Sequence, residues 1–138
     1  MTPTLVDASF FVALYNRREV AHRRCIEASR AIESQMVTCE ACIAEALHML
    51  GHASAAVEAI FASLELGALQ IPFHIGSNFR NVERVMDKYR DTPCDFADAC
   101  LIAMADEFDT GDILTLDSDF IHYRWKRTRR FNLLIPLD

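Results

Sequence analysis

Two acidic side chains of this 138-residue chain follow apolar runs that have the composition of β-strands. Asp7 comes directly after Thr4–Val6, and Asp117 comes directly after residues 113–116. Ligands of open parallel sheets bind outside the carboxyl ends of the strands, and parallel strands bring those ends to one edge. The pattern therefore predicts that the Asp7 and Asp117 carboxylates lie at the same edge of a sheet.

Two further acids stand in apolar helical segments. Asp98 precedes residues 99–105, where a thiol is the only polar side chain, and Glu45 lies in the middle of a second apolar segment. Helix capping explains Asp95 well, Asp98 only in part and Glu45 not at all, because a cap needs no apolar face beneath it. An acid amid apolar neighbours either reaches water at a rim or is committed to a partner.

Together, the four carboxylates indicate a metal site. Asp7, Glu45, Asp98 and Asp117 would repel one another in a dry cleft without a cation, and hard oxygen ligands suit Mg²⁺ or Mn²⁺. Such a site activates water and holds phosphate oxygens during an in-line displacement. We therefore expect these four acids to be both the catalytic residues and the metal ligands.

The cationic residues gather in two clusters although the net charge is −6. A negative chain is a poor candidate for an indiscriminate nucleic-acid coat, but arginine forks hold phosphate oxygens in pairs. By themselves the clusters are ordinary solvated faces. Beside a metal site that acts on phosphodiesters they are candidate surfaces for binding a polynucleotide. The first cluster is Arg17, Arg18, Arg23 and Arg24, of which Arg17 and Arg18 are the candidates, and the second is Arg124, Lys126, Arg127, Arg129 and Arg130.

Strand-like and helix-like segments alternate along the chain. The strands are expected at residues 4–7, 35–38, 68–73, 112–116 and 131–137, and the helices at residues 8–16, 19–34, 39–50, 54–67, 77–90 and 93–108. This alternation implies crossover connections, hence a parallel sheet with helices on both faces. The length suits one domain, so we expect a single three-layer α/β/α domain over residues 1–138.

The five cysteines give a weaker signal. Cys39 and Cys42 form a C-x-x-C pair, but no second pair completes a zinc site. Four of the five lie in apolar helical surroundings, where free cysteine behaves as a small apolar residue. A redox or zinc role for the pair is the less favoured interpretation.

Four segments resemble, in order and spacing, the acidic motifs of the PIN-domain ribonucleases, in particular those of the bacterial VapC-type toxins. The segments are "LVDASFFVALYN", "AEALHML", "DFADACLIAMA" and "ILTLDSDF". The resemblance implies a Rossmann-like fold with a central parallel sheet of four to five strands and divalent-metal-dependent RNA cleavage. By position, Asp7, Glu45, Asp98 and Asp117 match the four acids of that family. Ser9 and Thr115 match its supporting hydroxyls.

Two assignments stay open at this stage. Asp95 competes with Asp98 for the third acid, although the family helix fits better when it starts at Asp98. Asp119 could supplement or replace Asp117 at the metal. The resemblance also implies a homodimer and a small antitoxin protein that reaches into the acidic cleft.

Two other functions are alternatives to a nuclease. One is a PIN-like domain that binds RNA or a protein without cutting, which has no need of four mutually repelling acids. The other is a receiver-type phosphoacceptor domain. Such a domain requires paired acids after the first strand and a lysine near the last strand, and this sequence has neither. The N-terminal residues lack the basic and apolar regions of a signal peptide, and no apolar window could cross a bilayer, so we expect a cytoplasmic protein.

Overall fold

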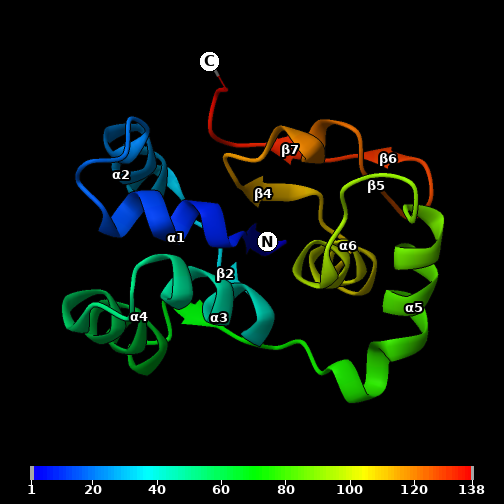
Figure 1. Ribbon diagram of the computed structural model, residues 1–138, viewed down its shortest axis with the longest axis horizontal. Coiled ribbons are helices and arrows are strands. Elements are labelled where there is room, and N and C mark those ends of the chain that lie inside the picture. The colour runs from blue at the N-terminus through cyan, green and yellow to red at the C-terminus, as the bar shows by residue number, and fades with distance from the viewer. Residues whose placement is uncertain (1, 138) are drawn as a thin grey trace.

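The computed structural model describes residues 2–137 and contains a five-stranded sheet in which all neighbours run parallel. The spatial order of the strands is β3-β2-β1-β4-β7, with β1 at the centre (Figure 1). The prediction of a parallel sheet of four to five strands is confirmed. The strands are β1 (Thr4–Val6), β2 (Met36–Val37), β3 (Leu69–Gln70), β4 (Asp112–Leu114) and β7 (Asn132–Leu133).

Helices occupy all six segments in which the sequence predicts them, with ends that differ by a few residues. They are α1 (Ala8–Tyr15), α2 (His22–Ala31), α3 (Glu40–Met49), α4 (Ser54–Glu65), α5 (Ile75–Lys88) and α6 (Phe96–Phe108). The differences reach three residues, as at the start of α2 and of α6, and α2 begins late because residues 17–21 form turns.

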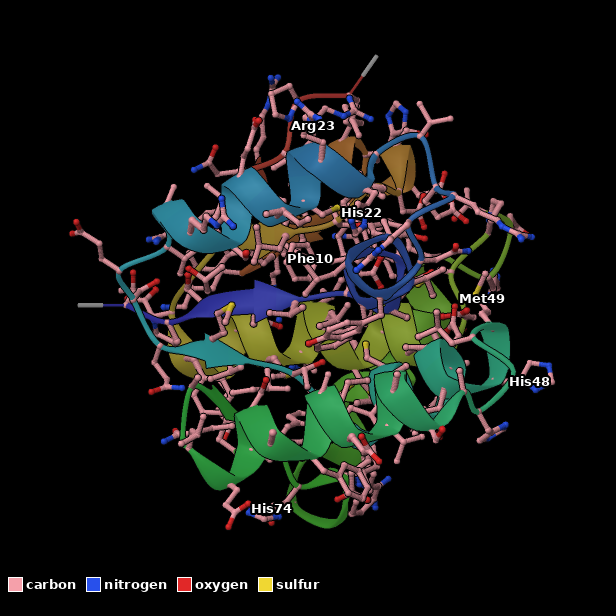
Figure 2. The ribbon with its side chains drawn as sticks, turned by 90° about the vertical axis from the view of Figure 1, so that its left-hand side faces the viewer. Phe10, His22, Arg23, His48, Met49 and His74 are labelled. Atoms are coloured by element: carbon pink, nitrogen blue, oxygen red, sulfur yellow. The ribbon has the colours of Figure 1, made fainter. Side chains whose placement is uncertain are left out.

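Helices cover both faces of the sheet, so the three-layer α/β/α arrangement is confirmed. In Figure 1, α1 and α2 lie on one side of the strands and α5 and α6 on the other. The helix α1 packs against α2 and α3, and α6 packs against α5, α3 and β1. Figure 2 shows Phe10 of α1 pointing into the interior, where its side chain is almost completely buried.

The helix α6 runs through the middle of the core. All seven residues from Ala99 to Ala105 are buried, as expected for a helix that is apolar on every side. Only its first turn, at Asp98, and its last residues meet solvent. The position of Asp98 is thus fixed by the packing of the helix that follows it.

The sequence analysis missed a small antiparallel hairpin of β5 (Arg124–Trp125) and β6 (Arg129–Arg130), separate from the main sheet. Its residues are mostly charged and show no apolar alternation, so strand patterning could not reveal it. The Trp125 indole lies against Gly111, where any Cβ would collide with the ring. One short η1 turn of 3₁₀-helix (Ser118–Ile121) precedes the hairpin.

No helix within residues 2–137 is long and apolar enough to cross a membrane.

Candidate active site

Asp7 lies at the carboxyl edge of the sheet and is held by hydroxyl groups. Strands β1 and β4 pair with Val6 opposite Leu114, so the next residues, Asp7 and Thr115, are neighbours. The Thr115 hydroxyl donates to Asp7 Oδ2 at 2.8 Å, and the Ser9 hydroxyl donates to the same oxygen at 2.7 Å. These two bonds fix the orientation of a carboxylate that is only 6% exposed.

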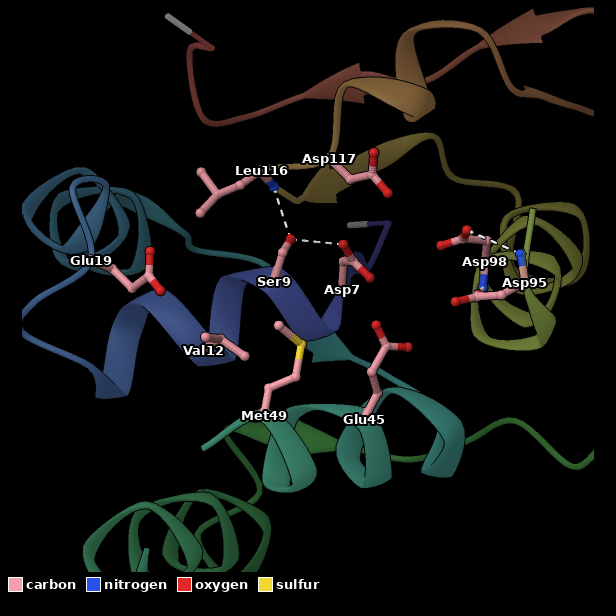
Figure 3. A pocket seen from close by; sticks show the side chains of 10 residues that line it. All are labelled: Asp7, Ser9, Val12, Glu19, Glu45, Met49, Asp95, Asp98, Leu116 and Asp117. Atoms are coloured by element: carbon pink, nitrogen blue, oxygen red, sulfur yellow. Dashed lines mark hydrogen bonds between the residues drawn. The ribbon is translucent and has the colours of Figure 1, made fainter. Parts of the chain in front are cut away.

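The two hydroxyls are themselves fixed by the loop that follows β4. The Leu116 N–H donates to Ser9 Oγ at 3.0 Å (Figure 3), and the Asp117 N–H donates to Thr115 Oγ1 at 3.0 Å. Thr115 is completely buried. Ser9 and Thr115 therefore connect Asp7 to the segment that carries Asp117.

Asp95 and Asp98 form a capping box at the start of α6. The Asp98 N–H donates to Asp95 Oδ1 at 2.8 Å, and the Asp95 N–H donates to Asp98 Oδ2 at 3.3 Å. The Tyr123 hydroxyl lies 3.3 Å from the same Asp98 oxygen and also donates to the Pro93 carbonyl. Asp95 is thus the helix cap that the sequence predicts, and Asp98 takes part in the cap as well as facing the site.

Asp117 and Asp119 diverge in the structure. Asp117 caps η1 by accepting the Asp119 N–H at 2.9 Å, and its carboxylate faces the same space as Asp7 (Figure 3). Asp119 instead lines a separate cavity beside Tyr89 and Tyr123. The geometry favours Asp117 as the fourth acid, with Asp119 as a neighbour that orients it.

All four candidate acids border one cavity of about 370 Å³. Glu45 projects into it from α3, opposite Asp117, while Asp98 faces it from α6 (Figure 3). Six of its ten lining residues are acidic and none is basic. The full lining is Asp7, Ser9, Val12, Glu19, Glu45, Met49, Asp95, Asp98, Leu116 and Asp117.

The pKa values of these acids respond to burial and to one another. Burial raises the pKa of Asp98 to about 7, and the charges of Asp95, Asp7 and Asp117 add to this effect. Burial is also the main cause of the raised pKa of Asp7, which the Ser9 and Thr115 hydrogen bonds oppose. The pKa values of Glu45 and Asp117 are raised for the same two reasons, burial and neighbouring carboxylates.

A hard divalent cation fits this set of donors. The ion pairs of the described residues use Asp87, Asp91, Asp106 and Asp109 rather than the cavity acids, which therefore lack a cationic partner. No three His, Cys, Asp or Glu side chains within residues 2–137 are gathered closely enough to hold an ion by themselves. Magnesium commonly keeps several waters and binds through one or two carboxylates, so an open acidic cavity suits it better than a closed cage.

Sequence reasoning missed one wall of the cavity. Val12, Met49 and Leu116 form an apolar side opposite the carboxylates, and Glu19 adds an acid from the loop before α2. Helical spacing alone makes Val12 and Met49 look like core residues, yet Met49 is 61% exposed. The ten described residues that line the cavity include no histidine, and the labelled His48 and His74 point away from the body of the molecule (Figure 2).

Most of the second basic cluster is engaged within the protein. The Arg124 guanidinium donates to the carbonyls of residues 121–123, and Lys126 and Arg129 both pair with Asp109. Asp109 follows the last residue of α6, whereas Asp98 lies in its first turn, so Lys126 and Arg129 stand at the opposite end of that helix. Arg127 and Arg130 are exposed on the same hairpin.

The first basic cluster is adjacent in sequence to one acid of the cavity. Arg17 and Arg18 are exposed and directly precede Glu19, which lines the acidic cavity. Arg23 and Arg24 belong to α2, and Arg24 donates to the Pro136 carbonyl at 2.8 Å. Arg17 itself lines a different cavity, beside Tyr15 and His22, so the pair is related to the acidic cavity only by its position next to Glu19 in the sequence.

Comparisons with known proteins agree with this arrangement. The family model described as "PIN domain" matches residues 4–126. The chain is similar to the crystal structure of VapC20 from Mycobacterium tuberculosis, described as a sarcin-ricin loop cleaving toxin, with a TM-score of 0.78 and 19% identity over 91% of this chain and 98% of that one. At this identity the likeness shows the fold alone. No curated protein matches the chain significantly.

Proposed function

Because the chain belongs to the PIN-domain family, we propose that it is a divalent-metal-dependent endoribonuclease whose single catalytic domain spans residues 1–138. The observation that carries the proposal is the cavity lined by six acids and no basic side chain. Carboxylates whose pKa values are raised by burial and mutual repulsion need a cation to be ionised together. Family membership also disfavours the receiver-type alternative.

In the proposed enzyme, some site residues would hold the metal ion and others would orient those ligands. Asp7, Glu45, Asp98 and Asp117 would hold Mg²⁺ or Mn²⁺, while Ser9 and Thr115 keep the Asp7 carboxylate in one orientation. Asp95 fixes the first turn of α6 and thereby Asp98, and Asp119 fixes Asp117 through its backbone N–H. When bound, the ion lowers the pKa of a water and withdraws charge from the phosphate oxygens. Cleavage is expected to leave a 5′-phosphate and a 3′-hydroxyl.

We further propose that the enzyme is the toxin of a toxin–antitoxin pair. The support is the fold-level likeness to VapC20 over 98% of that chain, together with the PIN-domain match. A homodimer in the cytoplasm, inhibited by a small antitoxin protein, belongs to the same proposal. The RNA substrate of VapC20 is not assigned to this chain, because a likeness at 19% identity shows the fold alone.

The test is an RNA cleavage assay with Mn²⁺, with Mg²⁺ and with EDTA, comparing wild type with Asp98→Asn. We expect cleavage only with a divalent ion, and a loss of at least about 100-fold in the variant, as for removal of a group that stabilises transition-state charge. Asp91→Asn is the control, because its side chain is 93% exposed on the loop before α6.

Full activity of Asp98→Asn, or full activity in EDTA, would contradict the proposal. RNA binding without products after long incubation, unchanged by EDTA, would instead favour a PIN-like domain that binds RNA without cleaving it. A neighbouring reading frame that encodes a small protein with a DNA-binding N-terminus would support the toxin assignment.

A further inference from the structure

The sulfur atoms of the C-x-x-C pair, Cys39 and Cys42, are in contact in the structure. Cys39 is the N-cap of α3 and Cys42 lies in its first turn, with their sulfur atoms 3.5 Å apart. Cys39, Cys42, Cys100 and Cys25 are all buried, as expected for cysteines in apolar surroundings, but Cys25 lies apart, on α2. A role as small apolar core residues therefore accounts only in part for these cysteines, because the sulfur atoms of Cys39 and Cys42 are also in contact.

Cys39 is buried but borders a cavity. Together with Cys100 of α6 it lines a second cavity, of about 600 Å³, which is distinct from the acidic one. The other walls are mainly apolar and include Phe73, Ile75 and Phe96, of which Ile75 and Phe96 are partly exposed at the surface. Cys42 does not line this cavity and is completely buried behind Cys39.

The environment of Cys39 favours its thiolate. The neighbouring thiols of Cys100 and Cys42 lower the pKa of Cys39 to about 4, and the backbone N–H groups of Cys42 and Ala41 act in the same direction. A helix N-terminus is a known setting for low-pKa cysteines. Cys25 shows the opposite behaviour, since burial raises its pKa to about 11.

We propose that Cys39 and Cys42 are an oxidisable dithiol that reacts with a small hydroperoxide entering through the apolar cavity. The inference is independent of the nuclease assignment, because it depends on other residues and on a different cavity. A thiol-metal site is the less suitable occupant, because no group of three ligating side chains within residues 2–137 is arranged to hold an ion.

The reaction has two balanced steps. The Cys39 sulfur attacks one peroxide oxygen, the O–O bond breaks, and the released alkoxide or hydroxide takes up the proton that Cys39 gave to solvent; Cys39 becomes a sulfenic acid. The Cys42 sulfur then attacks the Cys39 sulfur, the S–O bond breaks, and the sulfenic oxygen leaves as water with the Cys42 proton. Overall, two thiols lose two electrons to form a disulfide, and the hydroperoxide is reduced to an alcohol and water, or to two waters.

The geometry requires little movement. A disulfide has an S–S length of about 2.05 Å, so the two sulfurs, now 3.5 Å apart, need to approach by about 1.5 Å. Both belong to one helical turn, and rotation about their side-chain bonds can supply this distance without unfolding. Cys100 of α6 stays beside the pair, since it lines the same cavity as Cys39.

The test treats the reduced full-length protein with a stoichiometric amount of hydrogen peroxide, followed by alkylation in denaturant and peptide mapping. We expect free thiols to fall from five to three per chain, with the missing pair recovered as a Cys39–Cys42 linked peptide. Recovery of Cys39 and Cys42 as alkylated thiols, with oxidation at Cys94 instead, would overturn the proposal.

Two variants separate the roles of the sulfurs. Cys42→Ser should stop the reaction at a Cys39 sulfenic acid that dimedone traps, whereas Cys39→Ser should lose thiols at least about tenfold more slowly, because the thiolate is the reactive form. Cys25→Ser is the matched control and should react like wild type. Equal rates in Cys39→Ser and wild type, with both folded by circular dichroism, would overturn the assignment, and the wild-type peptide map decides the question even if a variant fails to fold.

Discussion

Asp98→Asn should make the metal-free protein more stable at neutral pH while removing its activity. The folded-state pKa of Asp98 is about 7, against an ordinary value of 3.8, mainly because of burial and then because of the neighbouring carboxylates. Asparagine keeps a carbonyl oxygen that can still accept the Asp95 N–H and so preserve the helix cap. The substitution therefore removes the charge without removing the acceptor.

The sign follows from proton binding. Well below the ordinary pKa of 3.8 the carboxyl is neutral in both the folded and the unfolded chain, and its charge has no effect on stability. As the pH rises, the unfolded chain releases its proton first, so the free energy of unfolding of the wild type falls until the pH passes about 7. The amide does not titrate, so the advantage of the variant grows through the same window.

The magnitude can be bounded from the pKa. The difference between 3.8 and about 7 corresponds to roughly 4 kcal/mol at about 1.4 kcal/mol for each pH unit. Because the carboxyl is only partly withdrawn from solvent, screening reduces this value, and we expect a gain of about 2 kcal/mol at pH 8. Addition of Mn²⁺ should reverse the order, since an ion at about 100 times its Kd stabilises the binding-competent wild type by about 2.7 kcal/mol.

The measurement is urea unfolding of wild type and Asp98→Asn from pH 4 to pH 8, with EDTA and with Mn²⁺. Asp91→Asn serves as the control for the loss of one negative charge on the surface. A variant that is destabilised equally at every pH would contradict the prediction, because the Asp98 carboxylate would then contribute to stability as a helix cap and not oppose it as a buried charge. Equal Mn²⁺ stabilisation of variant and wild type would show that Asp98 does not contribute to ion binding.

Three further substitutions probe other parts of the molecule. Thr115→Val should destabilise the protein by about 1.5–3 kcal/mol in urea unfolding and lower RNA cleavage, because it removes a hydrogen bond to the Asp7 carboxylate; an unchanged cleavage rate would deny Thr115 a positioning role. Leu101→Ala should lower the free energy of unfolding by about 2–5 kcal/mol in the same measurement, since this α6 side chain is completely buried. A smaller loss would mean that the surrounding core residues move in to fill the space left by the missing side-chain atoms. Arg18→Ala should weaken RNA binding in anisotropy titrations more than Lys126→Ala does, because Lys126 is already paired with Asp109; the reverse order would place the RNA on the β5–β6 hairpin.

The fold was predictable because its signals are local and periodic. Alternating strand and helix segments imply a parallel sheet, and the apolar run of α6 marks a helix buried on all sides. The acids Asp7 and Asp117 could be placed at one edge because parallel strands share their carboxyl ends. The β4 strand nevertheless ends at Leu114, so Asp117 reaches the cavity from the following loop and not directly from the strand.

The parts that could not be predicted depend on contacts between distant segments. Glu19 belongs to a turn without periodicity, and only the folding of α1 and α2 brings it to the cavity that Glu45 borders. Likewise, a C-x-x-C spacing does not reveal whether two sulfurs touch, or that a third cysteine, on another helix, lines the same cavity as one of them. The internal partners of Lys126 and Arg129 were invisible for the same reason, since Asp109 is many residues away.

Asp98 shows which effect dominates at the start of α6. A carboxylate in the first turn of a helix is favoured by the macrodipole by about 0.3–1 kcal/mol, and the Asp95 N–H lowers its pKa further. Burial and three neighbouring carboxylates act in the opposite direction, and they prevail, because the pKa is raised to about 7 and not lowered. At neutral pH the metal-free carboxyl is then about half protonated, so binding of a cation must expel a proton. Ion affinity should consequently weaken as the pH falls below 7, and a nuclease that depends on this ion should lose activity over the same range.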